Sequence, residues 1–505
     1  MPRINGDRQR HALLINKRLE GIAAARHKLV LQLEELDEQA KMMQRELNVL
    51  HNLDALTSNL PDEALAMIFE AGMLSDSGYW RHFGVDVSHV SSRWRRVALA
   101  TSRLWTRIAW RTHRRFEGRS TEAQQKFQSR AVAFLERARL APLDIAIFRF
   151  QLEDFSPDFL QLLNDHIGRC RNLCIEDAQQ EGLVKAIEYL STAAPLLNSI
   201  DLSSGCIDPD IYVELPCMLF LSGTPRLQTV QLHGVSVKSM HFALHALGSI
   251  TSLRLTSLLV DDSIEGGYNA FRNALMALQL LHHLELQLDR YEDDETGDLP
   301  IVLPSVRYLR LEAPPGHLDM LTCSFMAANL LAISLKGWDG QEYDIGMEDL
   351  STLRFPSLEH LILTDIDTNQ PFLDAYAKRF PDIKRLTCQV HPDARGCDID
   401  YVLTPMCFGT QKYEYPDDSG PPELDVEWDR WPKLEVIAIS ATDTPLDLSL
   451  HSMVAMAQYG SPLRKLMLPD ALCAKAGADV MAKIREDVQV EDYSLDWPTP
   501  FSECP

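Results

Sequence analysis

Long apolar runs and targeting signals are what this chain of 505 residues most clearly lacks. Its richest apolar stretch, 274–281, is broken by Gln279, so a membrane-spanning helix is not expected. The first residues lack the apolar segment of a secretory signal peptide, and no Asn-x-Ser/Thr sequon occurs. The ten cysteines are scattered without paired short spacings, which favours reduced thiols over a disulfide framework. We therefore expect a cytoplasmic or nuclear protein that does not contact membranes.

Motifs that carry catalytic or metal chemistry are also missing. The sequence contains no Gly-x-x-x-x-Gly-Lys loop, Gly-x-Gly-x-x-Gly, His-Glu-x-x-His or Gly-x-Ser-x-Gly elbow. Cys170 and Cys174 have no second pair nearby to complete a zinc site. His282 and His283 are adjacent in an expected strand, where alternation buries one ring and exposes the other. We expect no metal, no cofactor and no enzyme activity.

Basic residues are scarce over most of the chain, whose net charge is −23. Residues 1–130 hold 21 Lys and Arg against 15 Asp and Glu, whereas residues 131–505 hold 28 against 57. A general nucleic-acid binder needs a basic face, so we expect no nucleic-acid partner. The change of sign indicates that two regions of different character meet near residue 130.

A heptad pattern fills the N-terminal region. Its members alternate in spacings of four and three: Ile15, Leu19, Ile22, Arg26, Leu29, Leu33, Leu36, Ala40, Met43, Leu47 and Leu50. This period predicts a helix over 11–55 whose narrow seam faces a partner helix, interrupted only by Arg26. The partner helix belongs either to a second copy, in a coiled-coil dimer, or to another protein. The alternative is a single amphipathic helix that folds back onto its own chain.

Residues 56–110 predict a small all-α unit. Pro61 fits the first position of a helix, and Asp62 and Glu63 suit its positive N-terminal end. Two apolar stripes at helical spacing follow: Leu65, Ile68 and Phe69, then Val87, Val90, Trp94, Val97 and Ala98, with Arg93, Arg95 and Arg96 outside the second. A unit of about 50 residues is too small to be strongly stable alone, so docking onto a partner would suit it.

These residues carry a family resemblance. The run Leu60-Pro-Asp-Glu-Ala-Leu-Ala-Met-Ile-Phe69, followed by Val90-Ser-Ser-Arg-Trp94, resembles an F-box. The continuation 99–108 and the segment 134–145 are similar to F-box-like proteins expanded in mushroom-forming (basidiomycete) fungi, which also tend to carry a heptad helix before the box. The resemblance is close over residues 11–150 and extends to the remainder only in its general pattern. It departs from the pattern at Ser91, where Cys is usual, and in the 25-residue distance from Phe69 to Trp94, which exceeds that of a common F-box.

The resemblance implies docking on a Skp-type adaptor, which ties an F-box to a cullin–RING ubiquitin ligase. By resemblance, adaptor contact falls on Leu60, Pro61, Leu65, Ile68, Val90 and Trp94, with Phe69 and Trp105 in more structural roles. The physical interpretation agrees, because a helix laid in a groove concentrates affinity in a few apolar anchors. The alternative is that these helices only form a cap on the C-terminal domain.

After residue 165 an eight-residue template recurs, Pro-x-Φ-x-x-Φ-x-Φ, in which Φ is apolar. Clear copies start at Pro225, Pro304, Pro356, Pro381 and Pro432, and weaker ones at Gly168, Pro195, Gly248, Gln279, Ala328 and Ser461. The interval between the copies at Pro381 and Pro432 is about twice the usual spacing, which indicates a degenerate unit near Tyr401 to Phe408. A period of roughly 20–29 residues with one short strand is the leucine-rich-repeat arrangement. The template therefore predicts a degenerate parallel α/β solenoid, with an ordinary α/β domain as the alternative.

Strand residues that alternate with the apolar ones would form a binding surface for a protein segment. The outward candidates are Arg226, Gln228, Gln231, Glu285, Gln287, Arg307 and Arg310. Two acidic stretches, 291–298 and 415–418, are expected to be solvated loops.

The fold class expected is α/β, in five parts: a coiled-coil helix (11–55), an F-box-like domain (56–110), a connecting region (111–165), leucine-rich-repeat-like units (166–490) and a tail (491–505). This organisation predicts a non-enzymatic substrate-recognition subunit of an SCF-type ubiquitin ligase, whose repeats bind a target protein. The alternative is a non-ligase scaffold that uses the coiled coil and the repeats. A hydrolase or transferase with an unrecognised site is a third, less favoured class.

Overall fold

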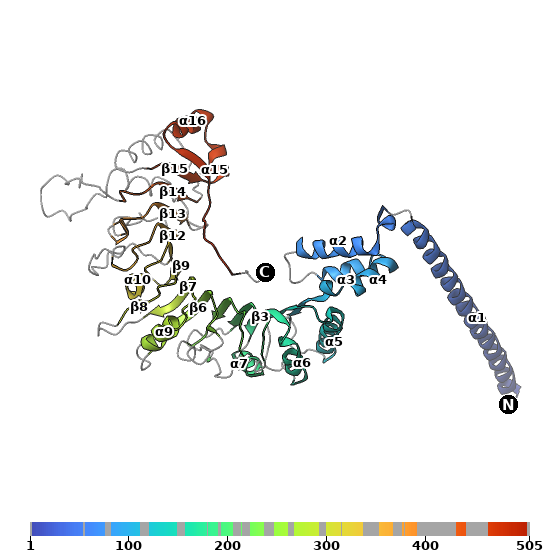
Figure 1. The fold of residues 1–505 in the computed structure, drawn as a ribbon. Coiled ribbons are helices and arrows are strands. Elements are labelled where there is room, and N and C mark those ends of the chain that lie inside the picture. The colour runs from blue at the N-terminus through green and yellow to red at the C-terminus, as the bar shows by residue number, and fades with distance from the viewer. Residues whose placement is uncertain are drawn as a thin grey trace. The chain divides into compact units, whose positions relative to one another are not determined.

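The computed structural model describes these residues: 3–53, 56–75, 82–111, 121–148, 157–178, 180–189, 193–205, 214, 223–236, 247–260, 267–291, 299–314, 316–336, 353–366, 376–377, 379–390, 431–440 and 463–501. The fold is mixed α/β, with a long N-terminal helix and a large parallel sheet (Figure 1). Contacts divide the chain into two compact units, with described residues up to Leu104 in the first and those from Trp105 onward in the second.

The predicted N-terminal helix is confirmed as α1 (Arg3–Leu53). No proline or turn interrupts its 51 residues, which span roughly 75 Å at about 1.5 Å per residue. Every side chain described on α1, from Arg8 to His51, is exposed, including the whole apolar seam. Nothing within the described chain therefore covers this seam.

The rest of the first unit is a compact helical group. Its elements are the 3-10 turn η1 (Leu56–Asn59), α2 (Asp62–Ser75), α3 (Phe83–Ser88) and α4 (Ser92–Ala100), and the turn η2 (Ser102–Trp105) follows, with its last residue in the second unit. The amide of Leu65 donates to the carbonyl of Pro61 at 3.1 Å, which places the proline at the start of α2 as predicted. At Gly72, a Cβ would lie 2.5 Å from the ring of Phe83, so this glycine permits the close approach of α2 and α3.

In the described residues of the second unit, fourteen strands form one sheet in which each strand pairs in parallel with the next. They are β1 (Arg107–Arg111), β2 (Leu143–Phe148), β3 (Cys170–Ala178), β4 (Ser199–Ser204), β5 (Thr229–His233), β6 (Ser252–Val260), β7 (His283–Tyr291), β9 (Tyr308–Glu312), β11 (Ala332–Lys336), β12 (His360–Ile366), β13 (Arg385–Val390), β14 (Val436–Ile439), β15 (Lys465–Leu468) and β16 (Gln489–Asp492). The short strands β8 (Ile301–Val302) and β10 (Phe325–Met326) pair separately.

Helices accompany this sheet along one face (Figure 1). Those on this face include α5 (Thr121–Ala138), α6 (Pro157–Ile167), α7 (Gln180–Tyr189), α9 (Gly267–Met276) and α10 (Leu318–Ser324), and α15 (Asp470–Lys475) and α16 (Ala478–Asp487) follow near the end. Alternate strand residues face this side; Leu253 and Leu255 of β6, for example, are at most 1% exposed. The apolar core therefore lies between the sheet and its helices.

The repeat template placed the strands correctly. Ten of its first apolar positions are followed two residues later by a strand: 197, 227, 250, 281, 306, 330, 358, 383, 434 and 463. The eleventh, Cys170, itself begins β3. The sheet starts earlier than residue 166, because β1 and β2 already pair within it. The degenerate unit expected near 401–408, and the acidic stretches at 292–298 and 415–418, lie outside the described residues.

Candidate functional site

The residues predicted to contact an adaptor occupy two different environments. Ile68 and Val90 are 51% and 59% exposed, and Pro61 is exposed at the start of α2. Leu60 and Trp94 are partly buried. Leu65 is 1% exposed, so its side chain packs inside the unit rather than on the surface.

Helix α2 is apolar on two sides, and only one of them is buried. Leu65 and Phe69 turn inward, where the Phe69 ring lies 4.9 Å from the Trp94 ring between centroids. Met67 and Leu74, on the solvent side with Ile68, are 72% and 73% exposed. We call Met67, Ile68 and Leu74 the α2 stripe. Met67 and Leu74 were not predicted from the sequence, although an apolar residue on the side of the helix opposite Leu65 was the available signal.

Arg93 holds the entry to α2. Its guanidinium is 2.9 Å from Asp62 Oδ1 and donates to the carbonyls of Thr57 at 3.1 Å and Ser58 at 2.8 Å. It also donates to the carbonyl of Leu60. One side chain thus satisfies carbonyls across the whole turn before the helix, a use of the planar fork that lysine could not copy. In the sequence Arg93 lies only outside the apolar stripe, and the tertiary fold brings it within reach of this turn.

Two further contacts fix the first unit. Arg96 lies 2.8 Å from Asp62 Oδ2, and the hydrogen bonds from Arg96 and Arg93 lower the pKa of Asp62. Ser91, where the family pattern has Cys, caps α4 by accepting a 3.2 Å hydrogen bond from the amide of Trp94. Trp105 packs in the second unit instead, 5.1 Å from the ring of Phe134 and beneath the guanidinium of Arg137.

On the sheet, a polar face lies opposite the helices. Asp201, Gln231, Arg254 and Glu285 stand in register on four successive strands. Arg254 pairs with Glu285 at 2.7 Å and donates to Gln231 at 3.0 Å, and Gln231 donates to Asp201 at 3.2 Å. This hydrogen-bonded row defines what we call the polar face.

Burial sets the charges of this row. It opposes ionisation of Glu285, but hydrogen bonds from His283 and Trp497 and the charge of Arg254 outweigh it and hold the pKa at about 2. Burial and the charge of Glu176 raise the pKa of Asp201 to about 7, against the effect of Arg254. The row therefore holds one firmly ionised carboxylate and one that titrates near neutrality.

Several predicted outward residues are less accessible than expected. Arg226, Gln228 and Arg307 are exposed, and Gln287 and Arg310 are partly exposed, but Gln231 and Glu285 are 8% and 4% exposed. Of the adjacent histidines, His282 is exposed and His283 is buried. His283 is not in the leucine core, however, since it shares the polar face with Glu285 at 2.8 Å. Trp497 and Phe501, near the C-terminus, contact His283, and Trp497 also bonds Glu285. No pattern in the sequence predicted these contacts.

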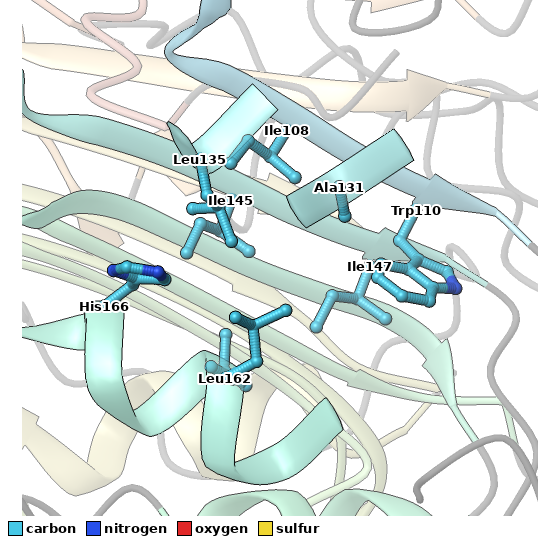
Figure 2. Close-up of a pocket in the computed structure, with 9 residues that line it drawn as sticks. Ile108, Trp110, Ala131, Leu135, Ile145, Ile147, Leu162 and His166 are labelled. Carbon is cyan, nitrogen blue, oxygen red and sulfur yellow. The ribbon is translucent and has the colours of Figure 1, made fainter. Parts of the chain in front are cut away.

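A small cavity lies beneath the start of the sheet. It measures about 20 Å³ and is lined by Ile108, Trp110, Ala131, Leu135, Ile145, Ile147, Leu162, Leu163 and His166. Figure 2 shows these side chains, drawn from β1, β2, α5 and α6, with the ring of His166 at one end. Burial and the charge of Arg169 lower the pKa of His166. The space is far below the several hundred Å³ of a typical ligand pocket, so it is a packing gap.

A larger hollow of about 340 Å³ opens where β7, β9, β11 and β12 end. Its charged groups are paired: Lys336 lies 2.9 Å from Glu312 and 3.1 Å from Asp365. Asp289 accepts from Ser257 at 2.6 Å. Among the described residues that line this hollow, no nucleophile is poised against a base.

Comparison with known proteins assigns no class. No family model matches the chain, and no curated protein matches it. Across the described residues, no group of three or more His, Cys, Asp or Glu is placed to hold a metal ion. Among those same residues, no helix is both long enough and apolar enough to span a membrane.

Proposed function

We propose that this chain is the substrate-recognition subunit of an SCF-type cullin–RING ubiquitin ligase. The first unit would bind a Skp-type adaptor, and the sheet, as a degenerate leucine-rich-repeat solenoid, would bind the target protein. The subunit would then promote ubiquitin transfer by proximity, because it raises the local concentration of target lysines near a ubiquitin-loaded carrier protein.

The observation that carries this proposal is the α2 stripe beside an F-box-like motif. Met67, Ile68 and Leu74 are each at least 51% exposed on a helix whose other side is buried. Burying a side chain of this size contributes about 1.5–3 kcal/mol, so a groove that covers three of them gains substantial affinity. The Arg93 contacts hold the turn before this helix, which lowers the ordering cost of binding.

The exposed seam of α1 adds a second interaction element, for dimerisation or for another partner. A non-ligase scaffold remains the alternative, and it would use α1 and the sheet in the same way without adaptor binding.

Co-purification of the full chain with a basidiomycete Skp-type adaptor tests the proposal. We expect a stable complex with the parent and loss of it in Pro61→Ala/Ile68→Asp, because a charge would enter the apolar contact. Glu34→Gln is the matched control, since Glu34 is exposed on α1 and lies outside both the α2 stripe and the apolar seam. A folded parent that does not bind, by circular dichroism and gel filtration, would leave the scaffold as the better account.

A further inference from the structure

The residues 494–501, which we call the tail segment, leave β16 and run back over the polar face (Figure 1). Their contacts reach strands more than one hundred residues earlier in the sequence: Trp497 touches Glu285 of β7, and Asp496 pairs with Arg385 of β13. The described helices occupy the other side of the sheet, and among the residues that the structure describes the tail segment covers this side near β6 and β7.

Three side chains are the main anchors of the tail segment, and a fourth, Thr499, accepts a 3.4 Å hydrogen bond from Arg254. Asp496 pairs with Arg385, which also donates 2.8 Å to the carbonyl of Ser494. The indole N–H of Trp497 donates to Glu285 at 2.8 Å. Phe501 is 4% exposed, with its ring 4.3 Å from the Arg254 guanidinium and 5.5 Å from the His283 ring. Acid, indole and phenyl groups thus each meet a complementary group on the sheet.

The surface beneath is shaped for aromatic side chains. His283 lies 5.1 Å from Trp497 and 5.8 Å from Tyr308, and Tyr308 lies 6.1 Å from Trp497. Arg254 and Glu285 frame these rings with charges of opposite sign. Aromatic rings against a paired arginine and carboxylate are typical of the residues that dominate protein–peptide affinity.

The manner of attachment favours exchange. None of the strand pairings in the described sheet includes the tail segment, so its release breaks no ladder hydrogen bond. Pro498 and Pro500 are exposed and fix their own φ angles, which lowers the entropic cost of ordering the segment. The face therefore holds the segment through its side-chain anchors and one main-chain hydrogen bond, from Arg385 to the carbonyl of Ser494.

We propose that the polar face, together with Arg385, is the recognition site for a segment of another protein that carries Asp-Trp followed by an aromatic residue four positions later. The tail segment is the intramolecular occupant of this site and competes with that ligand. The inference rests on the proposed function only in taking the ligand to be a ligase target.

A labelled peptide with the sequence of residues 493–501 tests this assignment on the full chain. The parent binds it weakly, because a tethered tail competes at an effective concentration near millimolar. Trp497→Ala/Phe501→Ala releases the tail, and we expect at least tenfold tighter peptide binding. Pro498→Ala, at an exposed position without a described anchor, is the matched control and should bind as the parent does.

Three results would overturn the proposal. The first is a folded double variant that binds the peptide no more tightly than the parent. The second is equal binding of a peptide in which Trp is replaced by Ala. The third is a parent dimer that is lost in the double variant but kept in Pro498→Ala, which would place the tail on a second copy. If the double variant does not fold, Asp496→Lys tests the same release at a side chain that is 46% exposed, with at least threefold tighter binding expected. The assay contains no adaptor, so its failure is separate from failure of the ligase proposal.

Discussion

Trp497 and Glu285 are 212 residues apart in sequence, yet the indole N–H donates a 2.8 Å hydrogen bond to Glu285 Oε1. The same carboxylate bonds His283 at 2.8 Å and pairs with Arg254 at 2.7 Å. It is therefore the point at which the tail segment joins the charged row of the sheet.

This geometry predicts unequal effects for two conservative changes. Trp497→Phe removes one donor and should lower the free energy of unfolding by about 1 kcal/mol. Glu285→Gln should cost about 1–3 kcal/mol, because Arg254 keeps its charge in a largely covered site without an ionised partner. Urea unfolding of the full chain measures both, and a smaller loss for Glu285→Gln than for Trp497→Phe would contradict the assigned roles.

Arg93 should be irreplaceable by lysine in the first unit. Arg93→Ala should destabilise the unit by about 1–3 kcal/mol, since the carbonyls of Thr57, Ser58 and Leu60 lose their donor. Arg93→Lys should recover less than half of that loss, because an ammonium cannot span the fork. Hydrogen exchange of amides 57–65 gives the local readout, and Arg95→Lys, an exposed neighbour on α4, is the control. Full rescue by lysine would show that charge alone suffices.

Asp201 should make stability fall as the pH rises. Its pKa is about 7 in the folded chain against an ordinary 3.8, so the folded state binds more protons than the unfolded state between those values. Asp201→Asn keeps the shape without the charge, and should therefore be more stable than the parent at pH 8 and lose this advantage towards pH 4. Denaturant unfolding of both proteins across this range measures the difference, in which the other titrating groups cancel. A difference independent of pH would refute the assignment.

The seam of α1 should pair with a second copy. Leu29 and Leu36 are 65% and 63% exposed, and a coiled-coil dimer would bury them. We expect a concentration-dependent dimer by sedimentation equilibrium, loss of it in Leu29→Asp/Leu36→Asp, and at least tenfold tighter association in Arg26→Leu. Glu34→Gln, outside the seam, should leave the equilibrium unchanged. A monomeric parent at high concentration would assign the seam to a different protein.

Periodic features of this chain could be predicted from sequence because each depends on near neighbours. The 3.5-residue period predicts a helix, no proline interrupts it, and α1 follows. The repeat template marks where a turn ends and a buried strand begins, and ten strands start two residues after its first apolar position. Pro61 likewise sets the start of α2, because its fixed φ angle acts locally.

Only the tertiary structure decided which of two similar side chains is buried or bonded and which stays exposed. Both sides of α2 are apolar, and only packing against Trp94 turned Phe69 inward and left Ile68 outside. Arg93 resembles Arg95 in sequence, yet it alone of the two reaches the carbonyls before α2. The tail segment has no periodicity to mark it, and its place depends on partners up to 245 residues away. Local patterns determine the elements, whereas long-range contacts between charged and aromatic side chains determine which faces remain free to bind.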